Sequence, residues 1–207
     1  MSLAPLPPLD GERLGHDPLA TFQRWFEEAR SLSALRYPDA ACLSTVTADG
    51  WPRGRIVLVK GADPRGFPFF TNYRSAKGHD IEATPRAGLT FYWDDLARQI
   101  RVTGPVERLS PEESDAYFRD RPAGSRLGAW ASEQSQPLDS REVLVRRVAE
   151  TAERFRGSEV PRPPHWGGYL LRPIEVEFWQ EGSDRLHDRF RFRADRVGGW
   201  IRERLNP

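Results

Sequence analysis

The feature that most constrains the fold is a series of strand-like segments that follow one another through short turns, without a helix after each. Apolar, β-branched and aromatic residues mark these segments. They are residues 41–47, 51–60, 67–73, 87–93 and 99–109, and later 169–171, 176–180 and 190–192. Parallel strands need a long crossover connection, whereas antiparallel strands need only a turn. The sequence therefore predicts a mainly antiparallel barrel or sandwich decorated by helices, not a parallel βαβ sheet.

Helix signals occur before and between these strands. Asp17 followed by Pro18 is a typical helix start, and apolar residues then recur at helical spacing. Ser110 and Glu113 form a capping-box pattern that opens another helix. Further helices are expected over residues 75–83, 127–132 and 139–155. In the helix over residues 139–155, the side chains expected to point toward the core are Val143, Leu144, Val148 and Ala152.

Length and composition predict one domain. The chain has 207 residues, and residues 1–16 are predicted as a flexible arm before a single domain over 17–207. One cysteine excludes an internal disulfide, so the cytoplasm is the expected location. We expect no membrane segment, because apolar runs stay far below about 20 residues. A net charge of +1 does not favour nucleic-acid binding. Four histidines and one cysteine lack metal-ligand spacing, so no metal site is predicted.

Two stretches near the middle of the chain could bind a ligand. In residues 55–60, strand alternation places Arg55 on one face and Lys60 on the other. The alternative is that both charges only keep an edge strand soluble, because edge strands commonly carry such flanking charges. In residues 69–78, a predicted strand is followed directly by a short helix that begins at Ser75 and carries Lys77 in its first turn. Free backbone N–H groups and a lysine at a helix start suit a phosphate. An ordinary serine cap with a solvated lysine is the alternative.

Two later stretches are also rich in polar and cationic residues. Residues 117–125 and 128–135 could surround a second anion, although cations also complement the end of a helix. In residues 185–190, a strand would place Arg185, His187 and Arg189 on one face. Three cations on one face repel one another unless an anion or an electron-rich ligand lies there. This stretch therefore predicts a binding site.

In this order, the stretches resemble the pyridoxine/pyridoxamine 5′-phosphate oxidase family. The resemblance runs from about residue 18 to the C-terminus. Its motifs are Arg-x-Val-Leu-x-Lys (55–60), Phe-Thr-Asn-x-x-Ser-x-Lys (70–77), Arg-Gln (98–99), Tyr-Phe-x-x-Arg-Pro (117–122), Gly-Ala-Trp-Ala-Ser-x-Gln-Ser (128–135), Trp-Gly-Gly (166–168), Glu-Phe-Trp-Gln (177–180) and Arg-Leu-His-Asp-Arg-Phe (185–190). The combination is specific, although each motif alone is weak.

The resemblance implies an FMN-binding split antiparallel β-barrel and a homodimer with FMN at the subunit interface. The implied FMN contacts are Arg55, Ile56, Val57, Leu58, Val59, Lys60, Phe70, Thr71, Lys77, Gln99, Gln134, Ser135, Trp179 and Arg189. The implied substrate contacts are Lys60, Tyr117, Arg121, Ser125, Arg185 and His187. Of these, Arg185 and His187 are the implied catalytic residues.

The implied reaction is the oxidation of pyridoxine 5′-phosphate or pyridoxamine 5′-phosphate to pyridoxal 5′-phosphate, in vitamin B6 biosynthesis or salvage. A hydride passes to FMN, and O2 then gives H2O2; the amine also releases ammonia. One position departs from the family. Ala76 stands where the family usually has an arginine that contacts the FMN phosphate, and Arg74 is a candidate to compensate.

Two alternatives stay open. A phenazine-pathway flavin oxidase shares the Arg-Leu-His segment, but such proteins tend to lack the equivalents of Lys60 and of the motif at residues 117–122. A non-catalytic flavin- or haem-binding split barrel would share the fold, because fold does not determine function. Such a carrier would not need a second phosphate site.

Overall fold

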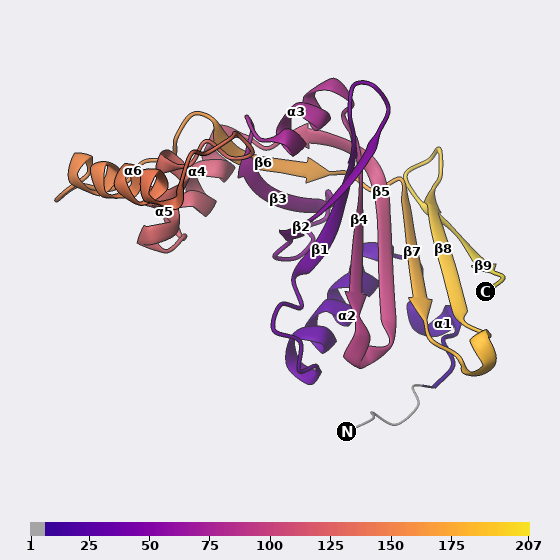
Figure 1. The fold of residues 1–207 in the computed structure, drawn as a ribbon. Helices are drawn as coiled ribbons and strands as arrows, with labels where there is room; N and C mark the ends of the chain where they lie inside the picture. Colours follow the sequence, from indigo (N-terminus) through magenta and orange to yellow (C-terminus); the bar gives the residue numbers. More distant parts are fainter. Residues whose placement is uncertain (1–6) are drawn as a thin grey trace.

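The computed structural model of the chain describes residues 7–207, which form one large sheet with helices around it (Figure 1). The strands are β1 (Ala40–Val46), β2 (Pro52–Leu58), β3 (Phe67–Asn72), β4 (Arg86–Trp93), β5 (Arg98–Arg108), β6 (Trp166–Leu171), β7 (Glu175–Gln180), β8 (Asp188–Ala194) and β9 (Trp200–Leu205). The α-helices are α1 (Gly11–Leu14), α2 (Pro18–Leu32), α3 (Ala76–Ala83), α4 (Pro111–Arg119), α5 (Ala123–Ala131) and α6 (Arg141–Arg154). Short 3-10 turns are η1 (Asp94–Leu96) and η2 (Ser183–Arg185).

All strand pairs in the described residues are antiparallel, as the sequence predicted. The main path runs β2-β1-β4-β5-β7-β8-β9, and β6 joins β5 to β3. The long strand β5 pairs with β7 over residues 98–103 and with β6 over residues 106–108. Strands β2 and β3 lie close together, but no strand pairing joins them in the described residues. The result is a barrel that is split between β2 and β3.

Helix α2 fills one end of the barrel with aromatic side chains. Asp17 caps the helix, because its Oδ1 accepts the Leu19 N–H at 2.9 Å. Phe22 is fully buried and meets Phe67 edge to face, with 4.8 Å between ring centroids. Trp25 meets the ring of Phe178 in the same way, at 5.1 Å. Burying each such side chain contributes about 1.5–3 kcal/mol, so α2 anchors the core.

The N-terminal segment is more ordered than expected in its described part. Residues 7–16, predicted as part of a flexible arm, include α1 and lie against the last two strands. The Leu9 N–H donates to Asp188 Oδ2 at 2.8 Å, and Arg204 Nη2 donates to the Leu9 carbonyl at 2.9 Å. Arg202 donates to the Gly15 carbonyl at 2.6 Å. Residues 1–6 of the predicted arm lie outside the described residues.

Helices α4, α5 and α6 project to one side of the barrel, opposite β7–β9 (Figure 1). The predicted capping box of α4 is present, with Ser110 and Glu113 bonded reciprocally. Helix α5 begins at Ala123, earlier than predicted, because Pro122 has an extended backbone that allows a helix to start directly after it. The expected inward residues of α6 are only half-buried, because α6 packs on α5 away from the sheet. In the described part of the chain, no helix is both long and apolar enough to cross a membrane.

Candidate active site

A cavity of about 630 Å³ lies between the split edge of the barrel and helices α4 and α5. It brings together most residues of two predicted sets. The predicted FMN contacts that line it are Ile56, Val57, Leu58, Lys60, Phe70, Thr71, Lys77 and Gln134. The predicted substrate contacts that line it are Lys60, Tyr117, Arg121 and Ser125. These residues come from β2, β3, α3, α4 and α5 and from the connections that follow β2, α4 and α5, and the last two strands of the chain do not contribute.

One end of this group is organised around Lys77 at the start of α3. The Ser75 side chain caps the helix by accepting the Gly78 N–H. Lys77 Nζ donates to Gln134 Oε1 at 2.9 Å and to Thr71 Oγ1 at 3.2 Å. Within residues 7–207 no carboxylate pairs with this ammonium group. Burial, and secondarily the charge of Arg55, lowers the pKa of Lys77 below 10.5. An anion at this position would relieve both effects.

Arg55 does not line the cavity. It donates to Thr45 Oγ1 at 2.5 Å, to the Leu43 carbonyl at 3.1 Å and to Asp80 Oδ2 at 3.3 Å. Asp80 is buried and also pairs with Arg53 at 3.4 Å. This network on α3 was not foreseen from the sequence, because it joins residues about 30 positions apart. It holds Arg55 close enough to influence Lys77.

A second cation site is formed by Arg121 on an aromatic platform. Its guanidinium carbon lies 4.5 Å from the ring centroid of Trp166 and 5.5 Å from that of Phe118. Its Nη1 is buried and finds no hydrogen-bond partner within the described chain. Burial also lowers the pKa of the Arg121 guanidinium from its ordinary value. An unsatisfied buried donor costs about 1–3 kcal/mol. This nitrogen is therefore positioned to bind an anion that enters the cavity.

The wall between these two cation sites is aromatic. The rings of Phe70 and Tyr117 are stacked, with 3.6 Å between centroids and 7° between planes. The ring of Trp166 continues the stack at 5.9 Å from Phe70. Trp166 lines the cavity although its role was not predicted, since only the motif Trp-Gly-Gly at residues 166–168 marked it. The stack gives the cavity a flat apolar surface beside its charged groups.

Three further predicted contacts, Val59 and Lys60 after β2 and Ser135 after α5, differ from one another in their burial and in whether they line the cavity. Lys60 lines the cavity and pairs with Asp39. The Val59 side chain is fully buried in the core, so only its backbone could face a ligand. Ser135 is exposed, has a left-handed backbone with φ of 72°, and is not part of the cavity wall.

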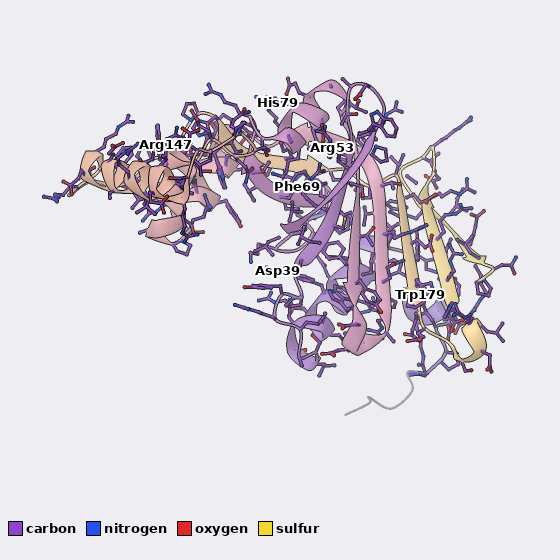
Figure 2. All side chains as sticks on the ribbon, in the orientation of Figure 1. Asp39, Arg53, Phe69, His79, Arg147 and Trp179 are labelled. Carbon is purple, nitrogen blue, oxygen red and sulfur yellow. The ribbon has the colours of Figure 1, made fainter. Side chains whose placement is uncertain are left out.

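The remaining predicted contacts form a separate group on the other side of the chain. Gln99, Trp179 and Arg189 are direct neighbours in register across β5, β7 and β8. None of them lines the cavity. In Figure 2, Trp179 lies far from Arg147 of α6, on the side of the sheet opposite the helical projection. A single chain therefore does not bring this group together with the cavity.

Glu177 supports this second group from within the sheet. Its carboxylate is buried, with Oε1 accepting from Arg189 Nε at 2.9 Å and Oε2 accepting from Arg101 Nη2 at 2.5 Å. Arg189 also donates to the Asn206 carbonyl at 3.0 Å. Sequence reasoning missed this role of Glu177, although the residue lies in the Glu-Phe-Trp-Gln motif. The pairing fixes the Arg189 side chain in place.

The strand predicted for Arg185 and His187 was wrong. Arg185 lies in η2 with φ of 62°, and β8 begins only at Asp188. The side chains therefore do not alternate as on a strand. Arg185 is exposed, and no carboxylate pairs with it in residues 7–207. The His187 ring packs 4.8 Å from the Trp179 ring, which joins both residues to the second group.

Arg74 is exposed and lines a neighbouring cavity of about 480 Å³. That cavity shares Asn72, Ser132 and Gln134 with the first. Arg74 does not line the first cavity. Its compensation for Ala76 stays a prediction, and the variant Arg74→Ala must bind FMN more weakly if the prediction holds.

Comparison with known proteins identifies the family. Residues 27–155 match the family model described as "Pyridoxamine 5'-phosphate oxidase", and residues 166–207 match "Pyridoxine 5'-phosphate oxidase C-terminal dimerisation region". The chain is 56% identical to the pyridoxine/pyridoxamine 5′-phosphate oxidase of Rubrobacter xylanophilus, over 92% of this chain and 87% of the relative. It is 53% identical to that of Burkholderia cenocepacia, over 96% of this chain and 93% of the relative.

Solved structures agree with this fold. PhzG from Burkholderia lata 383, solved with tetrahydrophenazine-1-carboxylic acid, has a TM-score of 0.90 at 33% identity, covering 99% of this chain and 100% of that chain. A pyridoxamine 5′-phosphate oxidase-related FMN-binding protein from Nostoc punctiforme has a TM-score of 0.73 at 20% identity, covering 94% and 100%. The predicted split antiparallel barrel with helices is confirmed. The chain belongs to the pyridoxine/pyridoxamine 5′-phosphate oxidase family.

Proposed function

We propose that this chain is a cytoplasmic, FMN-dependent oxidase of vitamin B6 biosynthesis or salvage, a pyridoxal 5′-phosphate synthase. It oxidises pyridoxine 5′-phosphate or pyridoxamine 5′-phosphate to pyridoxal 5′-phosphate, with O2 as the electron acceptor and H2O2 as a product. The amine substrate also yields ammonia. The identity of 53–56% to relatives that bear this enzyme name supports the assignment.

The observation that carries the proposal is the pair of cation sites in one cavity. Lys77 lacks a carboxylate partner in the described residues, and Arg121 has a buried donor without an acceptor there. FMN and the substrate each carry one phosphate, so the two sites match the two ligands in number and charge. A flavin carrier would need only the first of these sites, and the second therefore favours an enzyme.

The residues around Lys77 fit an FMN phosphate. Lys77 supplies the charge, and Thr71 and Gln134 supply further polar groups beside it. Backbone and side chains of residues 56–58 would lie along the flavin, since they line the same cavity. When bound, FMN supplies the redox chemistry by accepting a hydride from the C4′ carbon of the substrate and passing the electrons to O2.

The chain's own residues then bind and orient the substrate. Lys60, Tyr117, Arg121 and Ser125 would hold its phosphate. The stacked rings of Phe70 and Tyr117 keep one wall of the cavity apolar and exclude water from it. Arg185 would orient the substrate and polarise its reacting end, with His187 beside it. Such positioning lowers the barrier by fixing the reacting carbon near its acceptor.

A homodimer explains why the predicted contacts form two separate groups. The cavity group and the group around Trp179 and Arg189 lie apart in one chain. Except for Gln99 on β5, the second group falls within residues 166–207, which match a dimerisation region. We infer that each active site combines the cavity of one subunit with the C-terminal group of its partner. Two-fold symmetry would then create two equivalent sites.

The similarity to PhzG makes a phenazine-type flavin oxidase the second candidate. The overall structures agree closely, with a TM-score of 0.90. Sequence identity is however lower, at 33%, than to the vitamin B6 oxidases. Lys60 and Arg121 also line the cavity as a phosphate site would require. A substrate without a phosphate would leave the buried Arg121 donor without its acceptor.

Oxygen consumption tests the proposal. The purified, FMN-loaded protein is mixed with pyridoxamine 5′-phosphate or pyridoxine 5′-phosphate in an oxygen electrode, while absorbance follows the aldehyde product. The proposal expects oxygen uptake with matching aldehyde formation. A flavin-loaded protein that consumes no oxygen with either phosphate ester would contradict it and would favour the phenazine or carrier alternatives.

A further inference from the structure

The loop between β7 and β8 is closed by its own hydrogen bonds. The Leu186 N–H donates to the Ser183 carbonyl at 2.9 Å. The Gly182 N–H donates to the Nδ1 atom of His187 at 3.2 Å. The second bond spans most of the loop, from its second residue, Gly182, to the side chain of its last residue, His187. The loop that carries Arg185 therefore also determines how the His187 ring is held.

The backbone of this loop adopts a conformation that non-glycine residues seldom take. Asp184 has φ of 53° and ψ of 27°, and Arg185 has φ of 62°. Two consecutive residues with side chains thus lie in the left-handed region, which is unfavourable for each. Such strain persists only where surrounding contacts hold it, and it is concentrated at functional sites.

Gly182 is the position where those contacts are tightest. A Cβ atom built there would collide with the Leu186 carbonyl oxygen and lie 2.9 Å from its carbonyl carbon. A side chain at residue 182 would push the loop apart. Only glycine therefore allows the backbone N–H of residue 182 to approach the ring of His187.

This hydrogen bond has a consequence for the proton on His187. The Gly182 N–H is a donor, so Nδ1 must accept through its lone pair. In a neutral imidazole the proton is then on Nε2. The ring stays on the Trp179 ring at 4.8 Å, and no described residue accepts from Nε2. The Nε2–H group is thus available to a ligand.

We propose that Gly182 is a positioning residue that holds His187 as the Nε2–H tautomer, so that His187 donates a hydrogen bond to the substrate and does not act as a proton-abstracting base. The identity of the substrate rests on the proposed function. The tautomer itself does not, because it follows from the contacts of the loop. Arg185 and His187 then both act as donors toward the same ligand.

Nuclear magnetic resonance of ¹⁵N-histidine in the FMN-loaded protein tests the tautomer directly. The chain has four histidines, so His187→Gln assigns the His187 signals by their loss, and the same substitution at the exposed His79 of α3, His79→Gln, is the matched control. At a pH of about 8, where an ordinary histidine is neutral, we expect an unprotonated Nδ1 and a protonated Nε2. A protonated Nδ1 would overturn the proposal, whether or not the protein oxidises vitamin B6 phosphates.

Two substitutions of His187 separate a donor from a base. The amide of His187→Gln can replace the Nε2–H donor but cannot take up a proton, whereas the shorter His187→Asn reaches only the Nδ1 position. We expect kcat/KM to be at least about tenfold higher in the glutamine variant than in the asparagine variant, the scale of one or two hydrogen bonds. Equal loss in both variants would favour a base and contradict the proposal.

Gly182→Ala tests the positioning role. We expect FMN to stay bound, the His187 signals to report a mixture of tautomers, and kcat/KM to fall by about tenfold or more. A single Nε2–H tautomer in this variant would show that Gly182 is not required. If the variant does not fold, the spectrum of the unmodified protein still decides the tautomer. The expected spectrum without any oxidation would refute the proposed function alone.

Discussion

Lys77 Nζ donates to Gln134 Oε1 at 2.9 Å, which connects the first turn of α3 to the loop after α5. The two residues are 57 positions apart in the chain. The contact brings the helical projection against the barrel and leaves the ammonium group among neutral acceptors. In the proposed enzyme the FMN phosphate binds at this ammonium group.

The variant Lys77→Met is expected to bind FMN about 10- to 100-fold more weakly, because one charge-assisted hydrogen bond contributes about 1.5–3 kcal/mol. Fluorescence titration of the FMN-free protein measures this affinity. Riboflavin, which lacks the phosphate, is the control, and its affinity should stay within about twofold. An equal loss for both flavins would show that Lys77 supports the fold and not the phosphate.

FMN affinity is also expected to depend on pH through Lys77. Burial and Arg55 lower its pKa below 10.5, and the phosphate prefers the charged lysine. Affinity should therefore decline as pH rises through the lowered pKa. The FMN-free protein should instead gain stability over that range, because folding disfavours the charged form. Both trends should be smaller in Lys77→Met, and identical trends in the two proteins would contradict the assignment.

The variant Arg121→Met should raise the KM for pyridoxine 5′-phosphate by about 10- to 100-fold while leaving FMN affinity unchanged. Its stability should stay within about 1 kcal/mol of the original, because loss of the ring contact is offset by removal of the unsatisfied donor. Steady-state kinetics and urea unfolding measure the two effects. Arg119→Met is the control, since Arg119 is exposed at the end of α4. An unchanged KM would sink the proposed substrate-phosphate site.

The variant Glu177→Ala should destabilise the fold by about 1–3 kcal/mol, less than for a fully buried pair because Arg101 and Arg189 are partly exposed. Urea unfolding measures this loss. Glu175→Ala is the control, because Glu175 is one-third exposed and pairs with Arg191 at 3.8 Å. Its loss should stay below about 1 kcal/mol. Equal stability of the two variants would show that the carboxylate of Glu177 is not structurally important.

Local signals in the sequence predicted much of the fold. The cap at Asp17, the capping box at Ser110 and the alternation in β2 depend on near neighbours, and the structure confirms each. Strand β9 was missed because its sequence, with Arg202, Glu203 and Arg204 in succession, lacks the apolar alternation of a half-buried strand. Its charges are satisfied across the sheet by partners that the sequence does not place nearby.

The sequence predicted some features of the candidate site and missed others, because contacts between distant residues leave no local signal. The cavity residues lie in separate motifs that the fold brings together, and their roles as ligand contacts stay predictions. The turn at Arg185 was missed because a left-handed backbone at two non-glycine residues has no simple sequence signal. The partners of Arg55 and Arg189 were missed because Asp80 and Glu177 contact them only in three dimensions.

Mixing two poorly active variants tests whether each site joins the cavity of one subunit to the C-terminal group of its partner. Arg121→Met and Arg185→Ala should each bind FMN and turn over poorly. In refolded 1:1 mixtures, half of the dimers carry both variants and each has one intact site, so about a quarter of the original activity should return.

The control mixes Arg121→Met with Lys77→Met. Both changes lie in the cavity group, so neither site of a mixed dimer is intact and the mixture should be no more active than the mean of its two components. The activity of the first mixture should recover to about a quarter of the original, and the control mixture should show no recovery. A first mixture that stays as inactive as its components, although mixed dimers have formed, would contradict an active site shared between subunits.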